Sequence, residues 1–150
     1  MTDGDFSESE GFDLRDFLPY LLNRAAEESS LEFQQIYKDR YGMLRTEWRV
    51  LFHLGNYGEM TAKQIGELAK IHKTKISRAV HRLENRRYLS RSRSEADRRV
   101  ENLTLTPMGQ SVYRELSAIA EQYDTKLAAQ FRAEEVAVLR KLLRRLAHMG

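Results

Sequence analysis

Apolar residues recur at spacings of three and four along most of the chain, which is the pattern of amphipathic helices. The first such stretch begins near Leu14 and stops at Gly42, so it predicts a helix of roughly 25 residues, too long to be buried alone in a small domain. We therefore expect this helix to serve an interface. Two further stretches, from Pro107 through Leu127 and from about Ala133 through Leu146, predict long helices at the other end.

Three shorter helices are predicted between these long ones. The first carries Trp48 and runs to a break around Gly58. The second starts sharply at Thr61, because Thr61 and Gln64 have the residue types and the three-residue offset of a capping box. The third begins near residue 72 or 73 and continues to about Arg86. The positions expected to be buried are Ile65, Leu68 and Ala69 on the second of these helices and Ile76, Ala79, Val80 and Leu83 on the third.

After Tyr88 the apolar pattern changes from helical spacing to alternation. Leu103 and Leu105 alternate with polar residues, and the turn-prone stretch 94–99 separates them from an earlier segment at 89–93. This pattern predicts a short hairpin with an exposed tip. Thr106 and Pro107 then have the residue types favoured at an N-cap and at the first position of a helix. The predicted fold is therefore mainly α with a small β-hairpin, an α+β class.

Composition narrows the possible functions. The 150 residues suit one compact domain, and the absence of cysteine excludes a disulfide framework, a thiolate zinc site and a thiol redox switch. No apolar run approaches the roughly 18 residues of a membrane span. Residues 1–12 are acidic, which favours a mobile tail over a signal peptide. We expect a cytoplasmic protein that binds no membrane, no metal and no cofactor.

The charge is distributed unevenly along the chain. Residues 60–100 contain twelve Lys and Arg against four acidic residues, a net charge of +8, whereas the whole chain carries only +3 and the remainder therefore −5. One basic block on an otherwise acidic protein favours a polyanion as its partner. The alternative is an ordinary solvated basic face.

Two short helices followed by a basic hairpin have the order of a helix-turn-helix with a wing. If the apolar side of the helix at 73–86 faces the core, its opposite side presents basic and short polar side chains. Lys and Arg donate to guanine edges or phosphates, and Ser and Thr fit close to bases. The residues expected to enter the major groove of duplex DNA are Lys73, Thr74, Lys75, Ser77 and Arg78, with Arg82 on the flanking phosphates.

The hairpin tip supports the same interpretation. Asp97, Arg98 and Arg99 place a carboxylate beside two guanidinium groups, and an extended arginine suits the narrow, negative minor groove. Asp97 is interpreted as the group that orients an arginine, since a nearby cation lowers the pKa of a carboxyl group and keeps it ionised. An ordinary charged turn is the alternative.

Six strings stand along the chain in the order and with the spacing of one known family: EWRVL at 47–51, ELA at 67–69, KTKISRAV at 73–80, LE at 83–84, DRR at 97–99 and LTLTPMG at 103–109. In these strings the sequence resembles the MarR family of transcriptional regulators. The resemblance implies an intertwined homodimer built from the first, fifth and sixth helices, DNA contacts from the fourth helix and the wing, and often a small effector that weakens DNA binding. It also implies that Arg99 is the minor-groove arginine.

Two positions depart from the family pattern. Arg87 stands where such proteins usually have the glycine of a left-handed helix C-cap, so a non-glycine residue would be strained there. Leu44 stands where a Ser or Thr usually caps the second helix, although Thr46 offers a cap for a slightly later start.

This interpretation divides the compact domain into four segments: an acidic tail at 1–12, a dimerisation helix at 13–43, a winged helix-turn-helix region at 44–105 and C-terminal dimerisation helices at 106–150. A pseudo-palindromic operator needs two recognition helices at a fixed separation, which a homodimer supplies. The expected function is repression relieved by a small aromatic or carboxylate effector. The effector pocket is assigned to Tyr20, Arg24, Trp48 and His53, with plain interface or core packing as the alternative for each.

Two other classes of function are alternatives to a sequence-specific regulator. An enzyme is disfavoured because the chain has no Cys nucleophile, no Gly-rich phosphate loop and only scattered histidines. A non-specific architectural or RNA-binding protein would fit the charge. Single-strand binders, however, rely on exposed aromatic residues for stacking, and the basic block contains only Tyr88.

Overall fold

The computed structural model describes residues 11–150, so most of the segment predicted to be a mobile tail, 1–12, lies outside the described residues. Phe12, which is among the described residues, packs edge-on against Phe17 with ring centroids 5.3 Å apart. The elements are η1 (Leu14–Asp16), α2 (Leu18–Tyr41), α3 (Arg45–Tyr57), β1 (Met60–Thr61), α4 (Ala62–Ala69), α5 (Lys73–Asn85), β2 (Leu89–Arg93), β3 (Glu101–Leu105), α6 (Pro107–Ala128) and α7 (Ala133–Leu146).

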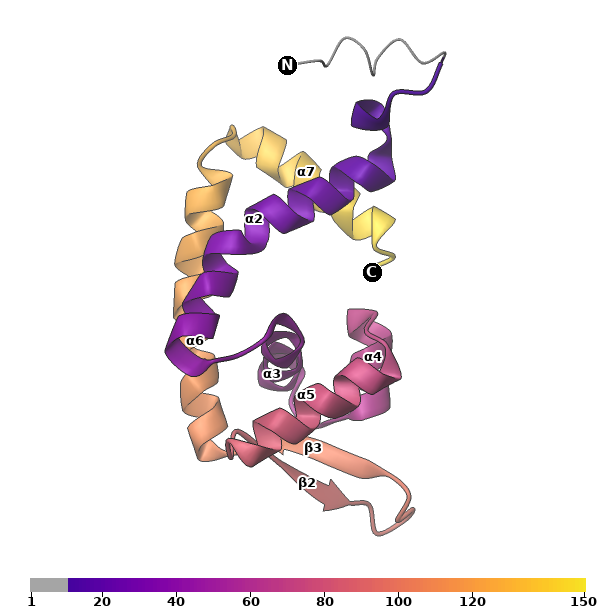
Figure 1. Cartoon of the computed structure of the whole chain (residues 1–150), viewed down its shortest axis with the longest axis vertical. Helices are drawn as coiled ribbons and strands as arrows, with labels where there is room; N and C mark the ends of the chain where they lie inside the picture. Colours follow the sequence, from indigo (N-terminus) through magenta and orange to yellow (C-terminus); the bar gives the residue numbers. More distant parts are fainter. Residues whose placement is uncertain (1–10) are drawn as a thin grey trace.

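The elements form two regions, as Figure 1 shows. One region holds α3, α4, α5 and the small sheet, and α2, α6 and α7 extend from it. The buried core lies mainly in the first region and includes Leu51, Ile65, Leu83 and Leu103, each at most 1% exposed. The structure therefore confirms the predicted class, a mainly helical winged helix-turn-helix with flanking helices.

The first predicted helix starts later than the apolar pattern indicates. Leu14–Asp16 form a single 3-10 turn capped by Asp13, whose side chain accepts a hydrogen bond from Arg15 N at 2.9 Å. The long helix begins at Leu18 with Pro19 in its first turn, a position where the missing amide costs nothing. Its predicted stop is confirmed, because Gly42 adopts the left-handed conformation, with φ of 62°.

The start of α4 is the predicted capping box. Gln64 N donates to Thr61 Oγ1 at 3.1 Å, and Thr61 N donates to Gln64 Oε1 at 2.9 Å. The expected burial of Leu68 is wrong, because its side chain is 60% exposed. This helix of eight residues packs through the narrow face that carries Ile65 and Ala69. Leu68 lies to one side of that face and is exposed to solvent.

The wing contains a third strand that the apolar pattern does not reveal. The sheet order is β1-β3-β2, with all neighbours antiparallel, and Met60 pairs with Leu103 and Thr61 with Asn102. Strand β2 pairs with β3 over its whole length, from Leu89 opposite Leu105 to Arg93 opposite Glu101. A two-residue strand is too short to show an alternating pattern, so only the hairpin was predicted.

Candidate DNA-binding interface

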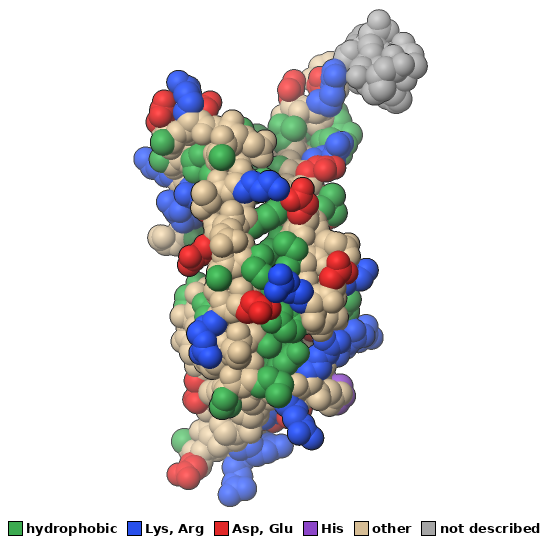
Figure 2. Space-filling model, turned by 90° about the vertical axis from the view of Figure 1, so that its left-hand side faces the viewer, with side chains coloured by type: hydrophobic (Ala, Val, Ile, Leu, Met, Phe, Trp, Pro, Cys, Tyr) green, Lys and Arg blue, Asp and Glu red, His purple; other side chains and the backbone are tan. Residues whose placement is uncertain are grey.

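Helix α5 is held by one face and free on the other. Its buried residues are Ile76, Ala79, Val80 and Leu83, the four predicted, and they pack against α3 and α4. The residues predicted to contact DNA are all exposed: Lys73, Thr74, Lys75, Ser77, Arg78 and Arg82. In the space-filling view of Figure 2, Lys and Arg side chains gather at the end of the molecule that carries this helix and the wing.

The N-terminus of α5 is capped by His72, which the apolar pattern places at the start of the helix without indicating a capping role. His72 Nδ1 accepts a hydrogen bond from Thr74 N at 3.2 Å, which satisfies one of the free amides of the first turn. Histidine is not among the common N-cap residues, so its type gave no signal. The cap places the exposed side chain of Thr74 on a fixed backbone, beside Lys73.

Arg82 has a partner inside the protein as well as an exposed face. Its Nη1 lies 3.6 Å from Oε2 of Glu47, a carboxylate on α3 that is 1% exposed. Glu47 Oε1 accepts a hydrogen bond from Leu44 N at 3.3 Å. Helix α3 thus begins at Arg45 with no hydrogen-bonding side chain at Leu44, and the later start capped by Thr46 does not occur. Sequence reasoning missed Glu47 because a lone glutamate in the first turn suggests only a helix-dipole contact.

The wing tip holds the predicted pairing of Asp97 with an arginine. Arg99 Nε donates to Asp97 Oδ1 at 3.1 Å and Arg99 Nη2 donates to Oδ2 at 3.3 Å, while Arg99 N also donates to Oδ1. These hydrogen bonds from the Arg99 side chain and backbone lower the pKa of Asp97. The side chain of Arg99 is 91% exposed, and Arg93 Nη1 donates to the carbonyl oxygen of Arg98 at 2.7 Å. The tip therefore presents an oriented guanidinium group to solvent.

The C-terminal end of α5 adopts the strained cap that the sequence predicted. Arg87 has φ of 65°, in the left-handed region, and its N–H donates to Glu84 O at 2.9 Å. Tyr88 N donates to Leu83 O at 2.9 Å, which completes a Schellman motif with arginine in place of glycine. Arg87 O in turn accepts a hydrogen bond from Thr106 Oγ1 at 2.6 Å, so this cap is joined to the start of α6.

Two contacts hold the end of α5 to the flanking helices, and a third joins α2 to α6. Gly109 of α6 lies so close to Tyr88 that a Cβ there would come within 1.9 Å of the Tyr88 carbonyl oxygen. Arg86 Nη2 donates to Gly42 O at 3.1 Å, at the end of α2. The hydroxyl of Tyr41 donates to Glu115 of α6, and burial, followed by this contact, raises the pKa of Tyr41 to about 12. Helix α5 is therefore anchored to both α2 and α6.

The four residues predicted to form an effector pocket are not brought together. Arg24 Nη1 donates to Tyr20 OH at 3.2 Å on an exposed part of α2. Trp48 of α3 packs among Phe33, Tyr37 and Phe52, whereas His53 contacts Arg49 O and the ring of Tyr57. Among the described residues, none of the four lines the large apolar groove between α2, α6 and α7.

Comparison with known proteins agrees with this architecture. The MarR family profile matches residues 41–100. A solved MarR/EmrR family transcriptional regulator from Acinetobacter sp. ADP1 is 26% identical, with 91% of this chain and 96% of that chain covered and a TM-score of 0.82. Residues 41–100 of the chain belong to the MarR family. This membership also decides against the enzyme alternative, because the family consists of transcriptional regulators.

Two other proteins are similar to this MarR-family regulator. BpsR of Bordetella bronchiseptica, whose structure concerns the regulation of its DNA binding by 6-hydroxynicotinic acid, is 25% identical, with 93% of this chain and 99% of that chain covered and a TM-score of 0.82. The HTH-type transcriptional regulator YwoH of Bacillus subtilis (strain 168) is 28% identical over 104 residues, 69% of this chain and 75% of YwoH.

Among residues 11–150, no helix has the length and apolar character to cross a membrane.

Proposed function

We propose that this MarR-family regulator is a cytoplasmic homodimeric repressor that binds a pseudo-palindromic operator and is released by a small effector. Each protomer places α5 in a major groove and Arg99 in the adjacent minor groove. One observation carries the DNA-binding part of the proposal: α5 exposes Lys73 and Arg78 beside a wing whose Arg99 is already oriented by Asp97. A pre-oriented guanidinium group loses less side-chain entropy on binding than a free one.

The division of labour on α5 follows from the positions of its residues. Those near the helix N-terminus, from Lys73 to Arg78, are assigned to base edges, because the N-terminal part of a recognition helix usually reaches deepest into the groove. Arg82 lies more than a turn further along and is assigned to a phosphate, with its guanidinium group braced by Glu47. Arg98 and Arg99 add cationic groups at the wing.

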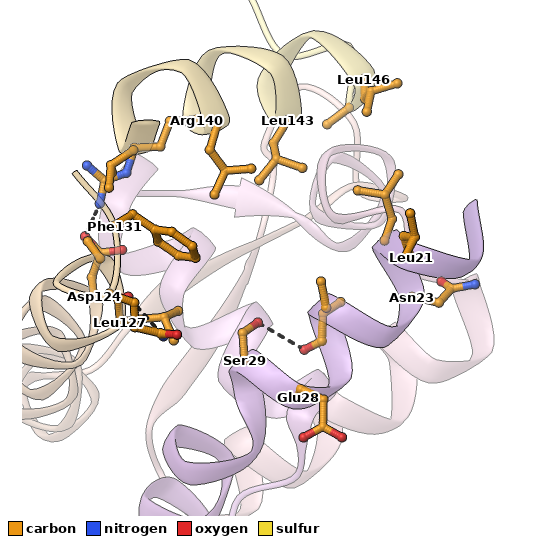
Figure 3. Close-up of a pocket in the computed structure, with 18 of the residues that line it drawn as sticks. Leu21, Asn23, Glu28, Ser29, Asp124, Leu127, Phe131, Arg140, Leu143 and Leu146 are labelled. Carbon is orange, nitrogen blue, oxygen red and sulfur yellow. Dashed lines mark hydrogen bonds and ion pairs between the residues drawn. The ribbon is translucent and has the colours of Figure 1, made fainter. Parts of the chain in front are cut away.

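The homodimer is supported by the apolar surface that a single chain leaves uncovered. None of the residues of α7, which the structure describes in full, is buried, and Val138, Leu139, Leu142, Leu143 and Leu146 are 40–54% exposed. Between α2, α6 and α7 lies a groove of about 990 Å³, into which Leu21 and Leu143 point from opposite sides (Figure 3). Monomeric proteins rarely expose so large a contiguous apolar surface, so a second copy of the chain is its proposed partner.

The effector proposal is supported by BpsR, whose DNA binding is regulated by 6-hydroxynicotinic acid. Of the four residues assigned to the pocket, Trp48 has the strongest case. Its Nε1–H is buried without a hydrogen-bond acceptor among the described residues, in a cluster of aromatic rings that suits a flat ligand. Arg24, expected to pair with a ligand carboxylate, lies beside Tyr20 on an exposed part of α2 and outside this cluster, so the proposed ligand contact rests on Trp48.

Selection of duplexes from random-sequence DNA tests this function. The full chain should bind the selected duplex about a thousandfold more tightly than random duplex, and equal affinities would instead support a non-specific architectural protein. Arg78→Ala should lower that ratio about tenfold and relax the preference at one base pair in each half-site. Lys126→Ala, which removes an exposed cation of α6 paired with Glu32, is the matched control and should change neither quantity.

The effector is tested in the same complex with small aromatic carboxylic acids. Trp48 is the only tryptophan of the chain, so its fluorescence reports directly on ligand binding. A compound that releases the DNA should also change this fluorescence, and Trp48→Phe should weaken the release. Release without any change in fluorescence would place the effector elsewhere.

A further inference from the structure

Arg91 joins the wing to the recognition helix. Its Nε donates to Glu84 Oε1 at 3.0 Å, and its Nη1 lies 3.7 Å from Glu101 Oε1. Glu84 belongs to the last turn of α5, Arg91 to the middle of β2 and Glu101 to the start of β3. One guanidinium group therefore links all three elements, and its side chain is only 31% exposed.

The wing needs such a link because its outer half is thinly supported. Strand β1 pairs with β3 only at Leu103 and Asn102, so the ribbon beyond this point has two strands. A two-stranded ribbon is marginally stable in water and twists readily. Arg91 pairs with Leu103 in the β2–β3 register, inside the three-stranded part and two residues before the two-stranded part begins at Arg93. Its contact with Glu84 lies where the direction of the ribbon is set.

We propose that Arg91 is a positioning residue that sets the angle between the wing and α5, and so the separation between the major-groove and minor-groove contacts. This inference rests on the proposed DNA-binding function and deepens it. The Arg91 link, defined here as Glu84, Arg91 and Glu101, acts through Arg99 at the wing tip and not through a contact of its own with DNA.

The charges of the link disfavour a direct phosphate contact by Arg91. Two carboxylates against one guanidinium group leave a net charge of −1, which repels a phosphate. The planar guanidinium group also explains the residue type, because its Nε and Nη1 reach two acceptors at once and a lysine ammonium lacks this fork. Arg91 differs in this respect from Arg98 and Arg99, which lie beyond it at the exposed tip.

The test compares Arg91→Met with the unmodified full chain on a duplex selected by that chain. We expect about a tenfold loss of affinity, because the wing is no longer held at the right angle. The slope of log K against log salt should stay unchanged, since no phosphate contact is removed. Arg91→Lys should recover little of the affinity that Arg91→Met loses. Lys126→Met, which removes a remote surface cation, should keep full affinity.

Glu84→Gln distinguishes the link from simple electrostatics. Removing a carboxylate beside DNA ordinarily raises affinity, whereas the Arg91 link predicts a loss of severalfold. In the Arg91→Met chain, Arg99→Ala should cost much less than it does in the unmodified chain, because a misplaced wing already lacks the Arg99 contact. A general loss of fold would not produce this coupling, and the thermal midpoint of each variant is measured alongside.

Either of two results would overturn the role of Arg91. Full affinity in both Arg91→Met and Glu84→Gln would show that the link does not position the wing. A fall of about one unit in the salt slope of Arg91→Met would show a direct phosphate contact. Failure of the DNA-binding proposal looks different, because the unmodified chain would then show no duplex preference and Arg99→Ala would have no effect.

Discussion

The DNA-binding region buries its apolar side chains within one chain, whereas α7 leaves its own apolar side chains exposed. In the first, α3 and α5 bury Val50, Leu51, Val80 and Leu83 almost completely within a single chain. In the second, the leucines of α7 are patterned as regularly as those of α5, yet each is at least 40% exposed. The same amphipathic pattern therefore marks a finished core in one place and an unpaired surface in the other.

The difference shows what amphipathic periodicity does and does not specify. It fixes which face of a helix is apolar, but the covering surface has to come from elsewhere. Helix α5 finds that surface in α3 and α4, whereas α7 has little contact with the other described elements and faces the open groove that Figure 3 shows. In the proposed homodimer, the second copy covers the face that the first leaves open.

The largest expected effect comes from removing α7, whose apolar face a single chain leaves exposed. Deleting residues 132–150 should abolish dimerisation and lower operator affinity at least about a hundredfold, because two recognition helices are no longer held together. Leu139→Asp with Leu143→Asp should do the same without shortening the chain. Sedimentation gives the oligomeric state and a gel shift gives the affinity.

Lys141→Asp is the matched control for these substitutions. It adds the same residue type to α7 at a position outside the groove, and it should leave the dimer intact. A chain with both leucines replaced that still sediments as a dimer and binds the operator fully would remove the proposed contrast between the two regions.

An intermediate effect is expected inside the finished core. Arg82→Ala leaves the buried carboxylate of Glu47 without its cation, which should lower the free energy of unfolding by about 2 kcal/mol. This value lies below the usual cost of breaking a buried pair because Arg82 is 55% exposed. Chemical denaturation measures the change. Glu47→Gln combined with Arg82→Ala should recover part of the loss, and an additive loss would show that the pair is not coupled.

The smallest expected effect is a gain in stability at the end of α5. Arg87→Gly relieves the left-handed strain at φ of 65° and should raise the free energy of unfolding by about 0.5–1 kcal/mol. Lys70, with φ of 57° at the end of α4, provides a second case of the same kind. A lower thermal midpoint for Arg87→Gly would mean that the arginine side chain contributes more than its backbone costs.

Local signals in the sequence predicted much of the fold. The capping box at Thr61 and Gln64, the Thr106–Pro107 helix start and the stop at Gly42 all depend on residues within a few positions of one another. The left-handed conformation of Arg87 was also predicted, because the helix end there requires it whatever the residue type. At the wing, the pairing of Asp97 with an arginine two residues away is equally local.

Contacts between distant residues could not be predicted in this way. Glu47 and Arg82 meet only because α3 packs on α5, and β1 exists only because two residues lie beside β3. The four residues assigned to the effector pocket were chosen by chemical type on two helices, but a shared helix pattern does not fix how far apart they lie. The exposure of Leu68 likewise depends on how narrow the packed face of α4 is.

The close contact of Gly109 with Tyr88 makes α6 a lever arm. With no room for even a methyl group between them, the first turn of this helix and the end of α5 have to move as one piece. A helix of 22 residues is about 33 Å long. Rotating the whole helix by about 5° about its C-terminal end therefore displaces its first turn, and α5 with it, by about 3 Å. In the proposed homodimer, a ligand would need to alter only this angle to change the separation of the two α5 helices, which would then no longer match the pitch of DNA.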